Sequence, residues 1–268
     1  PILLDLRTKQ GQLIERMETL PLGFKELVNA QMVEKEAFSH IFIENNANFT
    51  QKEAKNAIFL LKEINPKYQQ TLTKELLFKC YNDISAIFSD QRIDNQYLLN
   101  EQTEILLDQF LVWFNKPGLD RILKAAIAHL WFVAINPFPS HTSAIARIIA
   151  DLQLAKADGT GLRYYSMSEQ IAKEKSEYQF ILQQALRGSL DITIWLQWFL
   201  NCLKRAYDTA AIISAPIIEK ANFWKANSDI QFNKRQLKIL EKLLLGQLNE
   251  LTTTAYSIYV SCSRDTAL

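Results

Sequence analysis

The stretch that decides the fold runs Ile135-Asn136-Pro137-Phe138-Pro139-Ser140-His141-Thr142-Ser143-Ala144-Ile145-Ala146-Arg147. Arg121 to Ile135, just before it, repeats apolar residues with the period of a helix. A second apolar stripe follows, formed by Ile145, Ile148, Ile149 and Leu152. Two prolines in four residues cannot continue a helix, so they force an ordered turn. The segment therefore predicts two helices joined by a tight loop that runs into a helix N-terminus, where free N–H groups favour anions.

Helical periodicity also dominates the rest of the chain, and the fold class we expect is all-α with at most one short β-hairpin, in the polar segment Ser89 to Gln96. Thr50 and Glu53 have the spacing of a capping box that opens a helix ending at Asn65-Pro66. The other expected helices are Leu3 to Met17, Leu27 to Glu44, Leu72 to Phe88, Leu98 to Phe114, Ser176 to Leu186, Ile192 to Tyr207, a linker helix from Pro216, Lys234 to Leu245, Thr252 to Tyr259 and one from Ser263.

Composition agrees with this expectation and narrows the function classes. Apolar residues make up 48% of the 268 residues, and there are seven glycines and seven prolines, too few for a fold built on many turns. The net charge of +1 implies no long-range electrostatic attraction to nucleic acid or to a membrane surface. The three cysteines lack metal-ligand spacing, so no metal site is assigned from them. There is no signal pattern and no apolar run long enough for a bilayer, so the expected location is the cytoplasm.

Residues of the loop and its flanks resemble the Fic (Fido) family. Pro137, Phe138 and Arg147 stand in the register of its signature, His-Pro-Phe, any residue, Asp or Glu, Gly-Asn-Gly-Arg, two residues, Arg. The flanks also match family patterns, at His129-Leu130, Phe132 and Ile135 upstream and at Tyr165 to Ser168, Ile171, Tyr178, Leu182, Asp191, Thr193, Trp195 and Phe199-Leu200 downstream. The resemblance implies a Fic helical bundle and the transfer of AMP from ATP to a hydroxyl of a target protein, with ATP and magnesium as candidate ligands.

The signature is degenerate at the positions that carry the family's chemistry. Asn136 stands at the position of the catalytic histidine, and an amide has no nitrogen that accepts a proton near neutral pH. Ser140 replaces the acid that holds magnesium, and it is a poor ligand for that cation. His141, Thr142 and Ser143 replace the Gly-Asn-Gly that cradles phosphates, and Ala144 replaces an arginine.

The resemblance assigns the remaining candidate site residues. Thr142, Ser143 and Arg147 take the nucleotide-binding positions, and Tyr178 is expected at the rim of the adenine pocket. His141 is the candidate for a replacement base, although a solvated loop histidine is the simpler expectation.

A second candidate element ends the expected helix Leu27 to Glu44. Many Fic proteins carry an inhibitory helix with Ser or Thr, three residues, Glu, then Gly or Asn; Glu44 and Asn45 match it, whereas His40 departs at the first position. The resemblance predicts that Glu44 pairs with Arg147 where a nucleotide's terminal phosphate would lie. The simpler alternative is an ordinary charged residue near a helix end.

Domain organisation follows from the same comparison with the family. We expect an N-terminal helical extension at 1–66, a Fic core at 67–213, a linker helix at 214–232 and a partial winged-helix unit at 233–268. The last unit could place Ser263 to Leu268 in a DNA groove, but its basic surplus is small and no wing is visible, so DNA binding is weakly supported. An interaction or homodimerisation module is the favoured interpretation.

Three functional hypotheses remain open from the sequence. The first is a degenerate Fic protein whose transferase activity is lost or strongly impaired, and which binds a nucleotide or a partner protein. The second is a working transferase with a rearranged site, using His141 or a bound water. The third is a DNA-binding regulator acting through the C-terminal helices.

Overall fold

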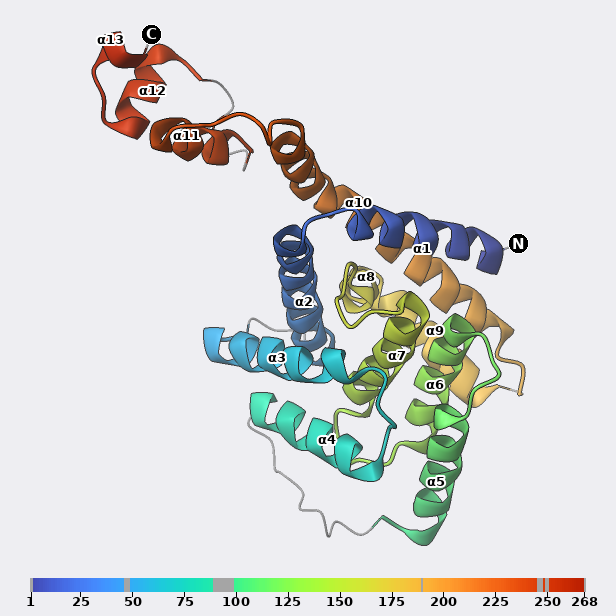
Figure 1. The fold of residues 1–268 in the computed structure, drawn as a ribbon. Helices are drawn as coiled ribbons and strands as arrows, with labels where there is room; N and C mark the ends of the chain where they lie inside the picture. The colour runs from blue at the N-terminus through green and yellow to red at the C-terminus, as the bar shows by residue number, and fades with distance from the viewer. Residues whose placement is uncertain are drawn as a thin grey trace.

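The structure is a computed structural model that describes residues 2–45, 49–88, 99–188, 190–244, 248 and 251–267. In that part of the chain all regular secondary structure is helical (Figure 1), which confirms the all-α prediction. The Ser89 to Gln96 segment, where a hairpin was expected, lies outside the described residues. The elements are α1 (Ile2–Glu18), α2 (Leu22–Asn45), α3 (Gln51–Ile64), the 3-10 turn η1 (Asn65–Lys67), α4 (Lys74–Phe88), α5 (Glu101–Asn115), α6 (Arg121–Ile135), α7 (Thr142–Asp158), α8 (Met167–Lys173), α9 (Lys175–Arg187), α10 (Thr193–Ala226), α11 (Lys234–Leu244), α12 (Thr253–Val260) and α13 (Arg264–Ala267).

The α6–α7 hairpin forms the centre of the molecule. Every residue of α7 from Ala144 to Ala155 is buried. One side of this helix, including Ala150 and Leu154, packs into a cluster with α1, α2, α6 and α8 to α10. Its other side, including Ile145 and Ile149, packs into a cluster with α2 to α6. Because both clusters share α7, the loop before α7 is held between two hydrophobic cores.

Local capping fixes where several helices begin. Thr50 accepts a hydrogen bond from the Glu53 backbone at 3.2 Å, and Glu53 accepts one from the Thr50 backbone at 2.5 Å. This is the predicted capping box. Asp120 starts α6 by accepting hydrogen bonds from the backbones of Ile122 and Leu123. The α6–α7 hairpin, in which residues Asn136 to His141 form the connecting signature loop, thus has a defined N-terminal end.

Two helix boundaries predicted from the sequence were wrong. Ile192 to Tyr207 and the helix expected from Pro216 form the single helix α10, Thr193–Ala226, with Pro216 inside it. A proline inside a helix costs about 3 kcal/mol, which the packing of a long helix can exceed; α10 buries Ala210, Ser214 and Ala221 on both sides of that position. In addition, α8 begins at Met167 in a segment for which no helix was expected, with Ser166 as its cap.

A single glycine is required by close packing near the end of α7. A Cβ added to Gly161 would lie 2.9 Å from the carbonyl oxygen of Asn65 and 3.2 Å from the Cα of Pro66. The loop after α7 can therefore approach η1 only with glycine at this position.

The C-terminal helices α11, α12 and α13 lie at the end of α10, away from the α6–α7 hairpin (Figure 1). Within this unit few side chains are buried, among them Ile239 and Val260. The four-part domain division given above stays a prediction. None of the described helices is long and apolar enough to cross a lipid bilayer.

Candidate functional site

Left-handed residues begin and end the signature loop. Asn136 ends α6 with φ of 47°, and its N–H donates to the carbonyl of Phe132 at 3.1 Å. His141 precedes α7 with φ of 58°. Asparagine and histidine tolerate this region better than most residues other than glycine. The loop therefore makes its two sharp reversals without a glycine.

Side chains inside the loop hold it closed. The hydroxyl of Thr142 donates to Oδ1 of Asn136 at 2.8 Å, which joins the two ends of the loop. Phe138 is buried, stacked on Tyr81 with ring centroids 4.9 Å apart. The hydroxyls of Ser140 and Tyr81 lie 3.3 Å apart. The amide oxygen at the family's histidine position is thus engaged within the protein.

Arg147, one turn into α7, is covered by the end of α2. Its Nη2 lies 3.0 Å from Oε1 of Glu44 and 3.5 Å from the backbone oxygen of His40. Arg147 is 3% exposed, and the Glu44 side chain 15% exposed. The structure therefore brings together the two residues whose pairing the sequence predicted, while the inhibitory role of the pair stays a prediction. The Asn45 side chain lies outside the described part of the chain.

His141 is not the solvated loop histidine that the sequence favoured. Its side chain is 8% exposed, with Nδ1 3.5 Å from Oε2 of Glu44. Its ring stacks on Phe88 at a centroid distance of 4.8 Å. Local sequence could not reveal this burial, because Phe88 and Glu44 belong to α4 and α2, far from the loop in the chain.

Glu44 is strongly biased toward its ionised form. Burial opposes ionisation, but the contact with His141 and the charge of Arg147 outweigh it and lower the pKa of Glu44 to about 2. Glu44 thus lies as a carboxylate between His141 and Arg147 and neutralises the one signature arginine that this chain keeps.

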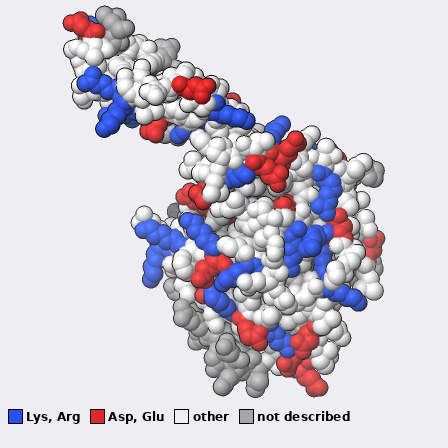
Figure 2. Space-filling model, in the orientation of Figure 1, with Lys and Arg blue, Asp and Glu red and all other residues white. Residues whose placement is uncertain are grey.

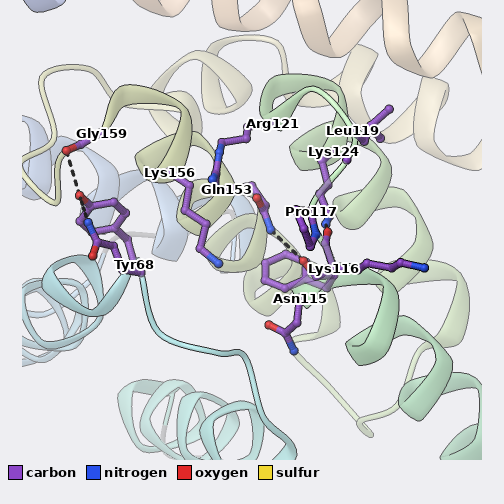
Figure 3. A pocket seen from close by; sticks show the side chains of 13 residues that line it. Tyr68, Asn115, Lys116, Pro117, Leu119, Arg121, Lys124, Gln153, Lys156 and Gly159 are labelled. Atoms are coloured by element: carbon purple, nitrogen blue, oxygen red, sulfur yellow. Dashed lines mark hydrogen bonds between the residues drawn. The ribbon is translucent and has the colours of Figure 1, made fainter.

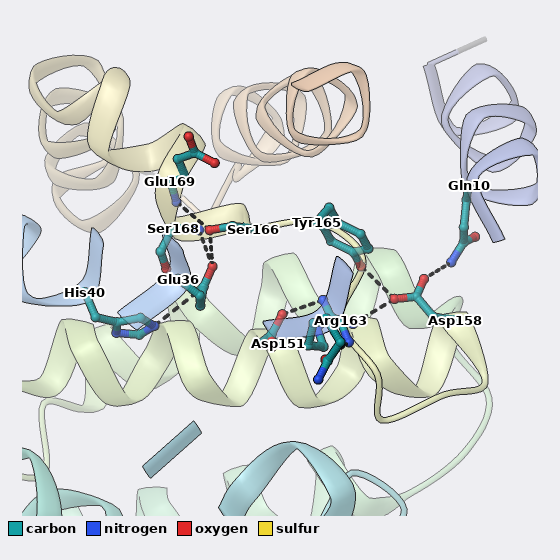
Figure 4. Close-up of polar contacts among 11 residues, drawn as sticks. Gln10, Glu36, His40, Asp151, Asp158, Arg163, Tyr165, Ser166, Ser168 and Glu169 are labelled. Atoms are coloured by element: carbon teal, nitrogen blue, oxygen red, sulfur yellow. Dashed lines mark hydrogen bonds and ion pairs between the residues drawn. The ribbon is translucent and has the colours of Figure 1, made fainter. Parts of the chain in front are cut away.

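A buried polar network joins α2 to the start of α8 and so fixes the position of α2 (Figure 4). Glu36 contacts Nε2 of His40 at 3.1 Å and accepts hydrogen bonds from the Ser166 hydroxyl at 2.6 Å and the Ser168 backbone at 3.0 Å. Although burial opposes it, these partners hold the pKa of Glu36 below its usual range. Sequence reasoning missed this carboxylate; its place one turn before His40, on the apolar side of α2, was the available signal.

A second part of the network ties the end of α7 to the loop before α8. Arg163 donates to Asp151 at 2.6 Å and to Asp158 at 2.8 Å, and the Tyr165 hydroxyl donates to Asp158 at 2.8 Å (Figure 4). Gln10 of α1 donates to the same Asp158 at 2.6 Å. These contacts hold α1, the C-terminal end of α7 and the α7–α8 loop together, at the end of α7 away from the signature loop.

Tyr178 lies on α9 and is 2% exposed. Its hydroxyl is 3.0 Å from Nε2 of His129 on α6. Burial raises the pKa of Tyr178, and burial together with the nearby Arg147 and His40 charges lowers the pKa of His129 to about 3. His129 is therefore a neutral core residue at physiological pH, and Tyr178 packs in the core beside it; its expected role at an adenine pocket stays a prediction.

The space around Arg147 is small. A cavity of about 10 Å³ is lined by residues including His129, Arg147 and Ser168, and one of about 20 Å³ by residues including His40 and Ala144. Such volumes admit at most a water molecule. A wider cavity of about 240 Å³ lies on the outer side of the loop, against Asn136 to Pro139.

The residues present do not fit a magnesium–triphosphate complex. A hard cation needs oxygen ligands, preferably carboxylates, and Ser140 offers a neutral hydroxyl already beside Tyr81. Nowhere in the described ranges do three His, Cys, Asp or Glu side chains converge to hold a metal ion. His141 and Ser143 place side chains where the family signature has glycine, and Glu44 already neutralises Arg147.

Comparisons with known proteins agree with this arrangement at the level of the fold. No protein-family model matches the sequence, and no curated protein is detectably similar to it. The structure is similar to that of a Fic-domain-containing signalling protein from Bacteroides thetaiotaomicron, with a TM-score of 0.60 and 17% identity over 80% of this chain and 98% of the other. It is also similar to a Fic family protein from Desulfovibrio desulfuricans, with a TM-score of 0.64 and 15% identity over 99% of this chain and 86% of the other.

Both similarities extend over most of each chain. The chain has the Fic (Fido) fold.

Proposed function

We propose that this protein is a Fic-fold protein that has lost, or retains only in strongly reduced form, the transfer of AMP to target hydroxyls, and that it acts by binding a partner protein. The observation that carries the proposal is the covering of Arg147 by Glu44 at 3.0 Å. The cavity that Arg147 lines has a volume of only about 10 Å³, so the signature arginine is already neutralised and enclosed.

The loop chemistry supports the same proposal. Asn136 cannot take a proton from a target hydroxyl, and Thr142 already donates to its amide oxygen. Loss of a general base alone typically lowers a rate by about a hundredfold to ten-thousandfold. Absence of a carboxylate at Ser140 and of a glycine-lined phosphate cradle would lower it further.

A second candidate is a working transferase with a rearranged site, favoured by one contact. Nδ1 of His141 lies 3.5 Å from Oε2 of Glu44, and a carboxylate beside an imidazole is the usual way to orient a histidine base. The contact is also what a closed, inactive loop requires, because the same carboxylate covers Arg147.

Labelled ATP separates the two candidates. The protein, its Glu44→Gln variant and a Glu44→Gln/Arg147→Ala variant are incubated with α-labelled ATP and Mg²⁺, alone and in a lysate. Glu34→Gln is the matched control, since Glu34 is an exposed carboxylate on the same helix. We expect no protein-bound label that depends on Arg147 above the background of the lysate. Label that depends on Arg147 would overturn the assignment of the protein as inactive. Loss of that label in His141→Gln would identify His141 as the general base.

The C-terminal helices suggest how a partner is bound. Leu237, Leu251 and Ile258 are 38%, 45% and 71% exposed on this small unit. Residues 233–268 hold five basic and three acidic side chains, a small surplus for DNA binding. We therefore propose that the unit pairs with a second copy of the chain.

Sedimentation of the protein and of Ile258→Glu tests this pairing. A dimer that dissociates in the variant is expected. A monomer at all concentrations, together with salt-sensitive binding to a random duplex, would favour the DNA-binding alternative.

A further inference from the structure

A basic cavity lies at the opposite end of the central hairpin from the signature loop (Figure 3). It has a volume of about 400 Å³ and lies between the turn from α5 to α6, the C-terminal end of α7 and the segment after η1. Because α6 is 15 residues long, the two ends of the hairpin are separated by about 20 Å at a helical rise of about 1.5 Å per residue. The cavity is therefore separate from the loop that contains Asn136.

Four cationic residues line this cavity without a carboxylate. Lys116 lies in the turn before α6, and the other three, Arg121, Lys124 and Lys156, lie on α6 and α7; none of the 13 lining residues is acidic. No salt bridge to any of the three is found among the described residues. The nearest carboxylate in sequence, Asp120, is paired with Arg7 at 2.5 Å and caps α6.

Burial and repulsion by neighbouring cations act on Lys124 and Lys156 in the same direction. Burial, with the charges of Lys156 and Arg121, lowers the pKa of Lys124, and burial with the Arg121 charge lowers the pKa of Lys156. Lys124 is 5% exposed. A charge that is buried without a counter-ion is costly, so an anion entering the cavity gains electrostatic free energy from all three groups.

Two of these cations, Lys124 and Lys156, are held in place by aromatic rings and backbone. The Lys124 ammonium donates to the carbonyl of Lys116 and lies 5.1 Å from the Trp113 ring centroid. The Lys156 ammonium lies 5.4 Å from the Phe114 ring centroid. The two ammonium groups are therefore positioned before any ligand arrives, which reduces the entropy cost of binding.

The rim of the cavity is fixed by contacts between distant segments. The Tyr68 hydroxyl donates to the carbonyl of Gly159 at 2.9 Å, and Gln153 donates to the carbonyl of Phe114 at 3.3 Å (Figure 3). Asn115 joins the chain before α4 through two hydrogen bonds with the Leu72 backbone, each 2.9 Å. The cavity is thus a fixed part of the fold and not a gap between loosely placed loops.

Size and chemistry select the ligand class. A volume of about 400 Å³ falls within the range of roughly 300 to 1,000 Å³ typical of small-molecule pockets and exceeds what one inorganic anion fills. A guanidinium beside two ammonium groups suits a doubly charged phosphate, while Tyr68, Phe114 and Pro117 offer apolar surface for an organic part. We propose that this cavity binds a small organic phosphate, independently of any activity at the signature loop.

Calorimetric titration of the full chain in 100 mM salt tests the proposal, with inorganic phosphate and AMP as probes and no added metal. AMP is expected to saturate one site and to bind at least about tenfold more tightly than phosphate. Arg121→Gln and Lys156→Gln should each weaken AMP about tenfold or more, since each removes a charge-assisted hydrogen bond.

One control variant accompanies the titration. Lys55→Gln removes an exposed lysine of α3 that does not line the cavity, so it should leave AMP affinity unchanged. Far-UV circular dichroism confirms that each variant is folded. Equal affinity for phosphate and AMP would overturn the organic assignment. Absence of saturable binding, or binding that survives Arg121→Gln/Lys156→Gln, would overturn the site.

Discussion

The hydroxyl of Thr142 donates a 2.8 Å hydrogen bond to Oδ1 of Asn136, so the residue that replaces the family's histidine is tied to a residue that replaces its phosphate cradle. Two departures from the signature, six positions apart, thus stabilise each other. A single substitution at either position cannot rebuild the family's site, because the partner remains in place.

Asn136 is expected to contribute to stability through its backbone as well as its side chain. Its φ of 47° is left-handed, a region that costs an ordinary residue about 1 to 2 kcal/mol. Asn136→Ala should therefore lower the free energy of unfolding by more than Asn136→Gly, which loses the same hydrogen bond but tolerates the backbone. Urea unfolding at pH 7 measures both. Equal losses would mean that the backbone relaxes on substitution.

Glu44 should stabilise the protein in a pH-dependent manner. Its pKa is about 2 in the folded state against 4.5 for the free side chain, which corresponds to roughly 3 kcal/mol at about 1.4 kcal/mol per unit. Because the folded pKa is depressed, this contribution is fully present above pH 4.5 and is lost as the pH falls toward 2. The difference in unfolding free energy between the protein and Glu44→Gln should be large at pH 7 and shrink by pH 3. Glu34→Gln, on the exposed side of α2, should show no such change.

His129 should produce a separate pH dependence nearer neutrality. Its pKa is about 3 when folded against 6.5 for the free side chain. Between these values the unfolded state binds a proton that the native state does not, so stability falls as the pH drops below 6.5. The slope approaches about 1.4 kcal/mol per pH unit. In His129→Gln the unfolding free energy should change less between pH 6.5 and 4.5, whatever its absolute value. An unchanged slope would show that His129 titrates normally.

Lys156 should destabilise the protein when no ligand is bound. It faces Arg121 and Lys124 across the basic cavity without a carboxylate partner among the described residues. Lys156→Gln is therefore expected to raise the unfolding free energy by about 0.5 kcal/mol at low salt, with a smaller gain in 1 M NaCl. Thermal unfolding in the two salt conditions measures it, with Lys55→Gln as the control. A loss of stability in Lys156→Gln would show that its packing on Phe114 outweighs the repulsion.

Arg163 should be the most sensitive charged residue outside the loop. It is buried and bonds two carboxylates, Asp151 at 2.6 Å and Asp158 at 2.8 Å. Arg163→Met leaves both without their cation, which typically costs about 3 to 5 kcal/mol. Arg205, which is 43% exposed and paired with Glu174 at 2.5 Å, provides the matched control. Arg205→Met should cost at most about 1 kcal/mol, as exposed pairs do. Chemical denaturation compares the two variants.

Much of the helical architecture could be predicted from local sequence. The capping box at Thr50 and Glu53 placed the start of α3, and apolar periodicity with flanking prolines placed α6 and α7. These signals work because capping and periodicity act between residues a few positions apart. The continuity of α10 through Pro216 was missed, since the packing that outweighs a proline comes from other helices.

The sequence by itself determined the chemical identity of the loop: an amide, a hydroxyl and bulky side chains stand where the Fic signature has an imidazole, a carboxylate and glycines. What surrounds each group was decided only by the tertiary structure. Burial of His141 on Phe88, the position of Glu44 between His141 and Arg147, and the convergence of Arg121, Lys124 and Lys156 join residues from separate helices. Such contacts depend on how helices pack, which no local pattern in the chain specifies.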